Sequence, residues 1–380
     1  MSGPRIVLRR DRPPLRVNPA LRPVCGARLR GGLSMSLITY VTRIHFADRV
    51  LEDALAEELA RLGTQRPLVL VEERHVSKDE DERLMDALPL AATPVRFVVR
   101  PGLPADADLR EAAAVFADVG CDGIVGCGGV RTLDLARILG GSGAPVVTIP
   151  TGTESVGLGP LAVDFARHGA RQTFTPSAIL CDATLTMDAD AEMTAAAGMD
   201  ALVHCLEAYL GTSFNPPADG IAIDGLRRAA QHLERAVENG RDLGARRELL
   251  AAALNAGLAA QKGFGGIEAA ARGLEAEAGA RHGMLHGALM PEVLAFNRPA
   301  ISDRFDAVRA ALSLEDEADV SDALTRLAER VGLPVRLSKA GIAASALPRA
   351  ARGAAADLAN RTNPRHATHR DYQKIMESAL

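Results

Sequence analysis

The first half of the chain alternates short apolar runs with helical patterns. The apolar runs predict buried strands at residues 68–71, 95–99, 123–126 and 145–150. Helical periodicity lies between them, at residues 109–119 and 132–139. Strands that alternate with helices are typical of a parallel sheet with helices on its faces. Ligands of such sheets bind at the carboxyl ends of the strands.

After about residue 184 the strand patterns stop and helical patterns follow one another. They predict helices at 191–210, 221–239, 245–262, 267–278 and 288–296, with shorter helices in the last hundred residues. The fold class we expect is an α/β domain over 36–183, followed by an all-α domain over 184–380, with a cleft between the two.

Chain length, net charge and cysteine content exclude several classes of protein. A chain of 380 residues is too long for one compact core, which agrees with two domains. The net charge of −4 gives no reason to expect nucleic acid or an anionic membrane as a partner. No apolar run reaches the roughly 20 residues that span a bilayer. The five cysteines form no CxxC pair, which indicates reduced thiols and a cytoplasmic location.

The N-terminal stretch differs from the rest because residues 1–34 carry eight Arg and one Asp. It has no apolar segment of the kind that a secretory signal needs. We expect residues 1–35 to be a disordered basic tail, or sequence that precedes a start at Met35.

Two pairs of polar residues at helical spacing predict a metal site. Asp200 and His204 lie four residues apart in a helical pattern, so both side chains lie on one face of the helix. His282 and His286 form a second such pair, and Glu268 lies fourteen residues before His282. Mixed imidazole and carboxylate ligands suit Fe(II), Zn or Mn. The alternative for Asp200 and His204 is a helix with a buried, hydrogen-bonded histidine and no metal.

A glycine-rich segment at residues 126–134 lies between a predicted strand and a predicted helix. Glycines there let the backbone approach a phosphate closely, and the helix N-terminus favours negative charge. Glu72 or Glu73 ends the strand at 68–71. An acidic residue in that place binds a ribose hydroxyl and favours NAD over NADP. The alternative is a solvated loop acid.

Residues 36–380 resemble the iron-containing alcohol dehydrogenase family, with features of the maleylacetate reductases of the same superfamily. The resemblance is carried by landmark segments at 38–46, 178–186, 198–209, 290–297 and 363–365. It implies a dinucleotide-binding α/β domain, an all-helical domain for metal and substrate, and NAD(P)-dependent reaction of a small alcohol or carbonyl compound. A homodimer is implied by analogy alone.

The resemblance also implies a ligand set, which is Asp200, His204, Glu268 and His282, for Fe(II) or Zn(II). Glu268 stands where the family has a histidine, which makes the site more negative by one charge and should weaken the Lewis acidity of the metal. Arg272 stands where many members carry a further histidine. It is no proton shuttle, because its pKa stays above about 12. Arg272 pairing with Glu268 would leave no third ligand and only a relic of the site.

The candidate catalytic residues are His286, His282 and Arg272, of which His286 is the expected proton donor because an imidazole titrates near neutral pH. For the cofactor, the glycine loop of the family aligns with this sequence when the Asp that ends the loop motif is matched to Asp134. Val130 and Arg131 replace a Gly and a Ser of that loop, and Arg131 is expected to pair with phosphate. The expected cofactor residues are Gly128, Gly129, Arg131, Asp134, Thr151, Gly152, Thr153, Ser155 and Glu73.

Three functions remain open from the sequence. The first is a metal-assisted NAD(P)-dependent dehydrogenase or reductase, with hydride transfer in the cleft between the domains. The second is a metal-independent enzyme similar to maleylacetate reductase, which uses His204, His282 and His286 on a carboxylate substrate. The third is a diverged relative without redox activity, acting as a partner subunit in a biosynthetic pathway. The identity of the substrate is not encoded in any motif that we recognise.

Overall fold

A six-stranded sheet forms the first half of the structure, a computed structural model that describes residues 42–380 except 73–75, 101–104, 154–157 and 159–174. All the strand pairs are parallel, and the strand order is β1-β6-β5-β4-β2-β3. The strands are β1 (Arg43–Phe46), β2 (Pro67–Val71), β3 (Val95–Val98), β4 (Gly123–Gly128), β5 (Val146–Pro150) and β6 (Ala178–Cys181). The expected parallel sheet is confirmed, and the expected N-terminal tail lies outside the described residues.

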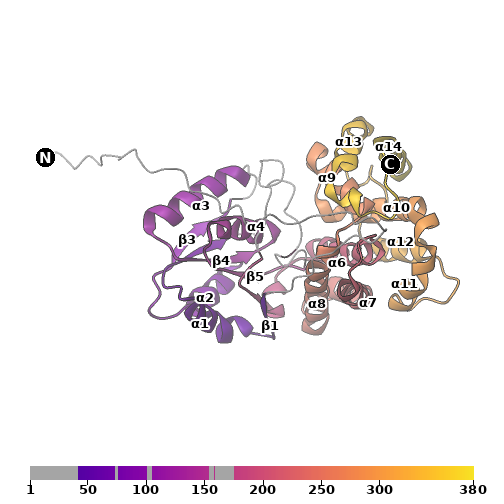
Figure 1. Cartoon of the computed structure of the whole chain (residues 1–380). Helices are drawn as coiled ribbons and strands as arrows, with labels where there is room; N and C mark the ends of the chain where they lie inside the picture. The colour runs from indigo at the N-terminus through magenta and orange to yellow at the C-terminus, as the bar shows by residue number, and fades with distance from the viewer. Residues whose placement is uncertain (1–41, 73–75, 101–104, 154–157, 159–174) are drawn as a thin grey trace. The chain divides into compact units, whose positions relative to one another are not determined.

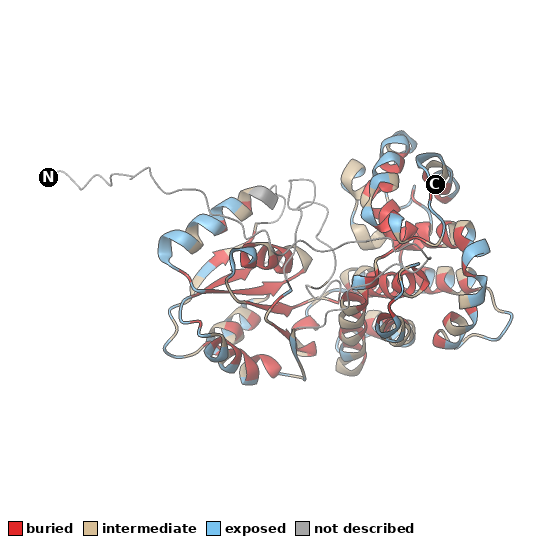
Figure 2. Cartoon of the chain, in the orientation of Figure 1, coloured by how far each residue is buried: buried red, intermediate tan, exposed pale blue. Residues whose placement is uncertain are grey.

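Helices cover both faces of this sheet. Alternate residues of a strand point to opposite faces, so Val69 and Val71 pack in the core formed with α1 (Val50–Leu62) and α2 (Lys78–Asp86). Leu68 and Leu70 pack in a second core on the other face. Helices α3 (Ala105–Val119) and α4 (Val130–Leu139) lie on that second side (Figure 1). Figure 2 shows the strands buried almost throughout, as expected where both faces are covered.

The register of the sheet brings two loops together. β4 and β5 are neighbours, and Gly128 at the end of β4 is paired with Pro150 at the end of β5. The segments that follow these two strands, which begin at Gly129 and Thr151, therefore leave the sheet side by side. They are the two loops that the sequence predicts for the cofactor.

The second half of the described chain is helical. Its helices are α6 (Ala191–Leu210), α7 (Pro216–Glu238), α8 (Leu243–Ala259), α9 (Gly266–Ala278), α10 (His286–Ile301), α11 (Phe305–Ala311), α12 (Val320–Arg330), α13 (Leu347–Ala356) and α14 (His369–Ala379), joined in places by short 3₁₀ turns. They share one large apolar core. The predicted order of an α/β part and then a helical part is confirmed, whereas the domain boundary at residue 183 stays a prediction.

Several helices begin earlier than expected: α3 by four residues, α4 and α8 by two and α9 by one, besides α7 and α10. α7 begins at Pro216, five residues before the predicted start, because Asn215 caps it and proline suits the first helical turn. α10 begins at His286 rather than at residue 288 and runs on to Ile301, past Pro291 and Pro299. The earlier start puts His286 at the first position of α10, next to the site described below.

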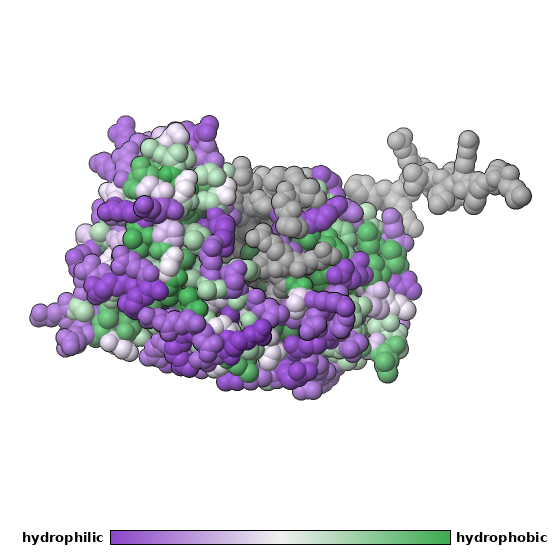
Figure 3. All heavy atoms as spheres, turned by 180° about the vertical axis from the view of Figure 1, so that it is seen from behind, coloured by the Kyte–Doolittle hydropathy of each residue, from purple (hydrophilic) through white to green (hydrophobic). Residues whose placement is uncertain are grey.

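No helix in the described part of the chain is long and apolar enough to cross a membrane. Figure 3 shows one face of the molecule, on which hydrophilic side chains predominate and hydrophobic ones are interspersed among them.

Candidate metal and cofactor site

Helix α6 supplies the first polar side chains of the site. It starts at a capping Asp190, whose carboxylate accepts a hydrogen bond from the Met193 N–H (2.7 Å). Asp200 and His204 follow on one face, as their spacing predicts, with 3.3 Å between Asp200 Oδ2 and His204 Nδ1. The imidazole of His204 stacks on Phe264, with ring centroids 4.2 Å apart and planes 8° from parallel. Both side chains are therefore held in place before any ligand binds.

Glu207, on the same face of α6, fixes the helix that carries Glu268. Its carboxylate accepts hydrogen bonds from the backbone N–H groups of Gly265 (3.0 Å), Ile267 (2.6 Å) and Glu268 (3.1 Å), at the start of α9. Burial raises the pKa of Glu207 to about 7, although these hydrogen bonds act in the opposite direction. Glu207 is not among the site residues predicted from the sequence. Its place seven residues after Asp200, which returns to the same helical face, was the available signal.

A second clamp at the start of α9 comes from much later in the chain. The side-chain oxygen of Asn363 accepts a hydrogen bond from the Gly266 N–H (2.9 Å). The amides of Asn297 and Asn363 also bond to each other in both directions, at 2.8 and 2.9 Å. The N-terminus of α9 is thus tied to α6, to α10 and to the segment around residue 363.

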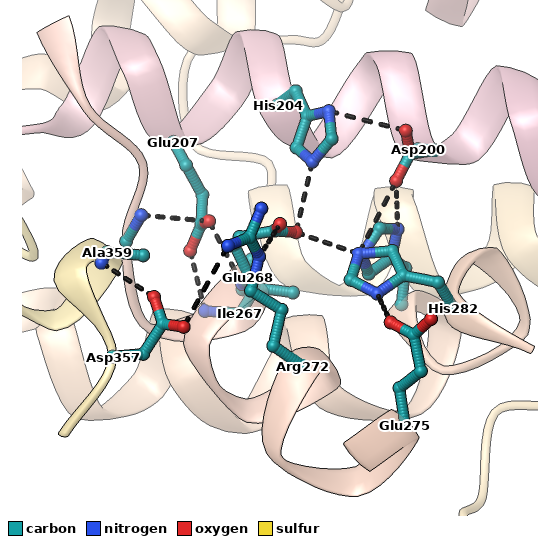
Figure 4. Close-up of polar contacts among 12 residues, drawn as sticks. Asp200, His204, Glu207, Ile267, Glu268, Arg272, Glu275, His282, Asp357 and Ala359 are labelled. Atoms are coloured by element: carbon teal, nitrogen blue, oxygen red, sulfur yellow. Dashed lines mark hydrogen bonds and ion pairs between the residues drawn. The ribbon is translucent and has the colours of Figure 1, made fainter. Parts of the chain in front are cut away.

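Glu268 lies at the centre of the cluster (Figure 4). Its Oε2 atom is 3.0 Å from His204 Nε2 and 2.8 Å from His282 Nε2. His282 belongs to the 3₁₀ turn His282–Met284, and its Nδ1 atom lies 2.9 Å from Glu275 Oε2, on α9. Glu275 is the second contributor that sequence reasoning missed. It lies seven residues after Glu268, again on the same helical face.

His286 occupies the far side of the same cluster. Its side chain is 0% exposed, and its Nδ1 atom lies 3.8 Å from Asp200 Oδ1, too far for a hydrogen bond. Among the described residues neither ring nitrogen has a hydrogen-bond partner. A buried imidazole left in this state costs free energy unless a ligand binds it.

Four groups come close enough together to share one metal ion. Asp200, Glu268, His282 and His286 each offer one ligand atom, and these atoms all lie within 4.8 Å of one another. The set includes His286 in place of His204, which the sequence had suggested as a ligand. His204 instead contacts both carboxylates of the set. Two carboxylates and two imidazoles suit a transition-metal ion or zinc.

The electrostatics of the cluster follow from opposite charges held close together. Burial opposes charge on all of these groups, yet the neighbouring carboxylates raise the pKa of His204 and lift that of His282 well above its usual value. Conversely, His282, Arg272 and His204 outweigh burial and hold the pKa of Glu268 well below its usual value. His286 differs, because burial and the neighbouring His282 drive its pKa well below the usual value. His286 is therefore neutral at pH 7.

Arg272 pairs with Glu268 as the i, i+4 spacing allows, but it uses only one carboxylate oxygen. Its Nε donates to Glu268 Oε1 at 2.5 Å, whereas Oε2 stays with the two histidines. A second carboxylate, that of Asp357, lies 3.9 Å from the guanidinium. The ion pair, which was the alternative to Glu268 as a ligand, thus leaves one oxygen directed at the site.

The glycine loop that follows β4 has the geometry of a close approach. Gly128 has a φ of +150°, which favours glycine, and a Cβ atom there would lie 3.0 Å from Thr132 Oγ1. Gly129 caps α4 without a side-chain hydrogen bond. The Thr151 N–H bonds to the Gly128 carbonyl at 3.2 Å, which joins the two loops.

The other residues expected at the cofactor divide into four groups. Arg131 donates to Asp108 at 3.1 Å and so turns towards α3. Asp134 is fully buried in an ion pair with Arg137 at 2.7 Å, which argues for a structural role. Thr151, Gly152 and Thr153 follow β5 directly. Glu73 and Ser155 lie outside the described residues, whereas the neighbouring Glu72 is buried at the end of β2.

Two family models match most of the chain. The model described as iron-containing alcohol dehydrogenase matches residues 42–154. The model for the C-terminal part of the Fe-containing alcohol dehydrogenase family matches residues 194–380. The second match covers every residue of the candidate metal cluster, and the first covers most of the two loops.

Individual relatives agree with these models. The chain is 34% identical to 4-hydroxybutyrate dehydrogenase of Cupriavidus necator, over 91% of this chain and 100% of that protein. It is 29% identical to NAD-dependent methanol dehydrogenase of Bacillus methanolicus, over 73% and 82% of the two chains. The crystal structure of maleylacetate reductase from Agrobacterium tumefaciens superposes with a TM-score of 0.76 at 23% identity, over 91% and 99%. This last likeness shows the fold alone.

Proposed function

The chain belongs to the family of iron-containing alcohol dehydrogenases, and from this premise we propose that it oxidises a small primary alcohol with a nicotinamide cofactor and a divalent metal. The reverse reaction, reduction of the aldehyde, uses the same site. Because its relatives include 4-hydroxybutyrate dehydrogenase, 4-hydroxybutyrate is the first substrate to test.

The observation that carries the metal proposal is the buried His286. Its unbonded nitrogens lie beside two carboxylates and a second imidazole, a donor set that fits a divalent metal. Asp200, Glu268, His282 and His286 would hold the ion, with His204 in contact with both carboxylates. When bound, the metal supplies Lewis acidity towards the oxygen of the substrate. Because His286 is neutral and inaccessible, we assign it to binding rather than to the proton donation expected from the sequence.

We propose that the pyrophosphate of the cofactor lies against Gly128, Gly129 and the N-terminus of α4. The helix end favours a negative charge there. The hydroxyl groups of Thr132 and Thr151 are buried and lack a hydrogen-bond partner among the described residues, and both residues contact Gly128. Pairing of Arg131 with phosphate remains a prediction, since it requires Arg131 to leave Asp108.

Replacing Gly128 with Ala is expected to weaken NADH binding by about tenfold or more, or about 1.4 kcal/mol. The positive φ and the contact with Thr132 strain any residue with a Cβ atom, at a cost of about 1–3 kcal/mol. Gly143→Ala is the matched control, because Gly143 also has a positive φ (+95°) but open space around it. Fluorescence titration measures the affinity of each variant for NADH, and thermal melting measures the loss of stability that the strain causes. Equal NADH affinity in the two variants would exclude this loop as the cofactor site.

The proposed function itself is tested by titrating NADH and NADPH into the purified protein, with metal and after chelation. The chain has no Trp, so cofactor emission is read against little protein background. We expect saturable binding that favours NADH, and turnover of an alcohol that chelation abolishes. Turnover that survives exhaustive chelation would favour the metal-independent alternative. Failure to bind either cofactor would contradict the proposal and favour a partner subunit without redox activity.

A cytoplasmic location and a homo-oligomer remain proposals. The first is supported by the cysteines of the described chain, which are buried free thiols: Cys121, Cys127, Cys181 and Cys205.

A further inference from the structure

The carboxylate of Glu268 is divided between two environments. Oε1 accepts the hydrogen bond from Arg272 Nε at 2.5 Å, and Oε2 lies within 3.0 Å of nitrogens of His204 and His282 (Figure 4). Arg272 comes from the same helix, one turn later, and its side chain is 17% exposed. The guanidinium and the two imidazoles therefore approach different oxygens of one buried carboxylate.

This arrangement changes the net charge in the surroundings of a bound metal ion. From the sequence, Glu268 makes the site more negative by one charge than a histidine in its place would. Arg272 carries one positive charge directly beside that carboxylate, so Glu268 and Arg272 together are neutral, as a pair of uncharged residues would be. With neutral imidazoles, Asp200 is then the one charged member of the four-residue ligand set whose charge is not paired with Arg272. The expected weakening of Lewis acidity is thereby offset.

We propose that Arg272 is a positioning residue that makes Glu268 a one-oxygen metal ligand of compensated charge. The proposal rests on the metal site of the proposed function. A carboxylate can bind a metal through one or both oxygens. The Nε–H of Arg272 occupies Oε1 and holds the carboxylate plane, so only Oε2 is offered to the site. Asp357, 3.9 Å from the guanidinium on its other side, keeps Arg272 in place.

Arg272 has two opposed effects on a metal, since it positions Glu268 and also adds a positive charge nearby, and together they predict a change of sign in a double-mutant cycle. In the natural background the loss of positioning should outweigh the removal of a positive charge, because R272Q leaves the carboxylate loosely held, so Co²⁺ affinity should fall about 10- to 100-fold. In the E268Q background Arg272 is an uncompensated cation next to the metal, so adding R272Q should raise Co²⁺ affinity. R272K keeps the positive charge and N–H donors but lacks the planar guanidinium, so it should retain more Co²⁺ affinity than R272Q. A residue that matters only for packing would produce neither the reversal nor the rescue.

The experiment measures Co²⁺ binding to the full chain by the visible absorption of the bound ion, with the melting temperature of each metal-free variant as a check on folding. R349M is the matched control, because Arg349 also pairs with a glutamate of α9, Glu277, but is exposed. It should leave Co²⁺ affinity and the spectrum unchanged. If R272Q alone does not fold, the comparison of E268Q with E268Q/R272Q still decides, since neither retains the buried carboxylate.

Each result has a defined meaning. A loss in R272Q with retention in R272K, or a gain on adding R272Q to E268Q, supports the proposal. Natural affinity and spectrum in R272Q, equal losses in R272K and R272Q, or a further loss on adding R272Q to E268Q would overturn it. Failure of the natural protein itself to bind Co²⁺ would instead contradict the metal site of the proposed function. The proposed role of Arg272 would then be contradicted as well.

Discussion

Replacing Asp200 with Asn is expected to remove the bound metal and to lower kcat/KM for alcohol oxidation by about 10³-fold, or about 4 kcal/mol. The change keeps the shape of the side chain but removes the charge. Asp200 lies 3.3 Å from His204, 3.7 Å from His282 and 3.8 Å from His286, so it borders all three imidazoles. No other carboxylate of the described chain approaches His286 as closely.

Metal content and steady-state kinetics measure this effect, and NADH affinity should stay close to natural because the glycine loop is untouched. Glu192→Gln is the control, since Glu192 is an exposed carboxylate on the same helix α6. Natural metal content in the Asp200→Asn protein would show that the cluster is held by ion pairs and does not need this carboxylate for a metal.

Replacing His286 with Leu is expected to have opposite effects on the metal-free and the metal-bound protein. Without metal, the buried imidazole has no hydrogen bond among the described residues. Removing it should raise the free energy of unfolding by about 1 kcal/mol or more. With metal, the loss of one ligand should weaken binding by at least about tenfold and reduce the stabilisation that a metal gives.

Thermal melting with and without Zn²⁺ measures both effects in one series. His366→Leu is the control, because His366 is exposed, and it should change neither quantity. A lower melting temperature in the metal-free His286→Leu protein, together with unchanged Zn²⁺ binding, would mean that His286 is a packed core residue rather than a ligand.

The periodicity of the sequence predicted much of the fold because it is a local property. Helix α6 begins and ends at the predicted residues, since its cap, its apolar content and the glycine after it all lie within one short segment. The helices α1 and α2 were not predicted, and α10 was predicted two residues too late. His286 was expected to be the proton donor, and its burial at the start of α10 was not foreseen.

Within the site, only pairs of residues one helical turn apart could be predicted from the sequence. Asp200 with His204 and Glu268 with Arg272 were both recognised as i, i+4 pairs. Which oxygen of Glu268 meets which partner depends on residues 64 positions apart, such as His204 and Glu268, and no spacing rule gives that. The contacts of Asp134 and Arg131 were missed for a similar reason. The sequence indicates a loop there, whereas the contact of Arg131 depends on α3 and that of Asp134 on its burial beside Arg137.

The hydrogen bond between Asn363 and the start of α9 can form only late in the synthesis of the chain. Gly266 is held by Asn363, a residue 97 positions later in the chain. Every side chain of the metal cluster therefore leaves the ribosome well before Asn363, the second of the two residues that hold their central helix. During synthesis these groups belong to a nascent chain in which Glu207 is present to hold the start of α9 but Asn363 is not. The metal cluster therefore reaches its full set of supporting contacts only when the polypeptide is complete.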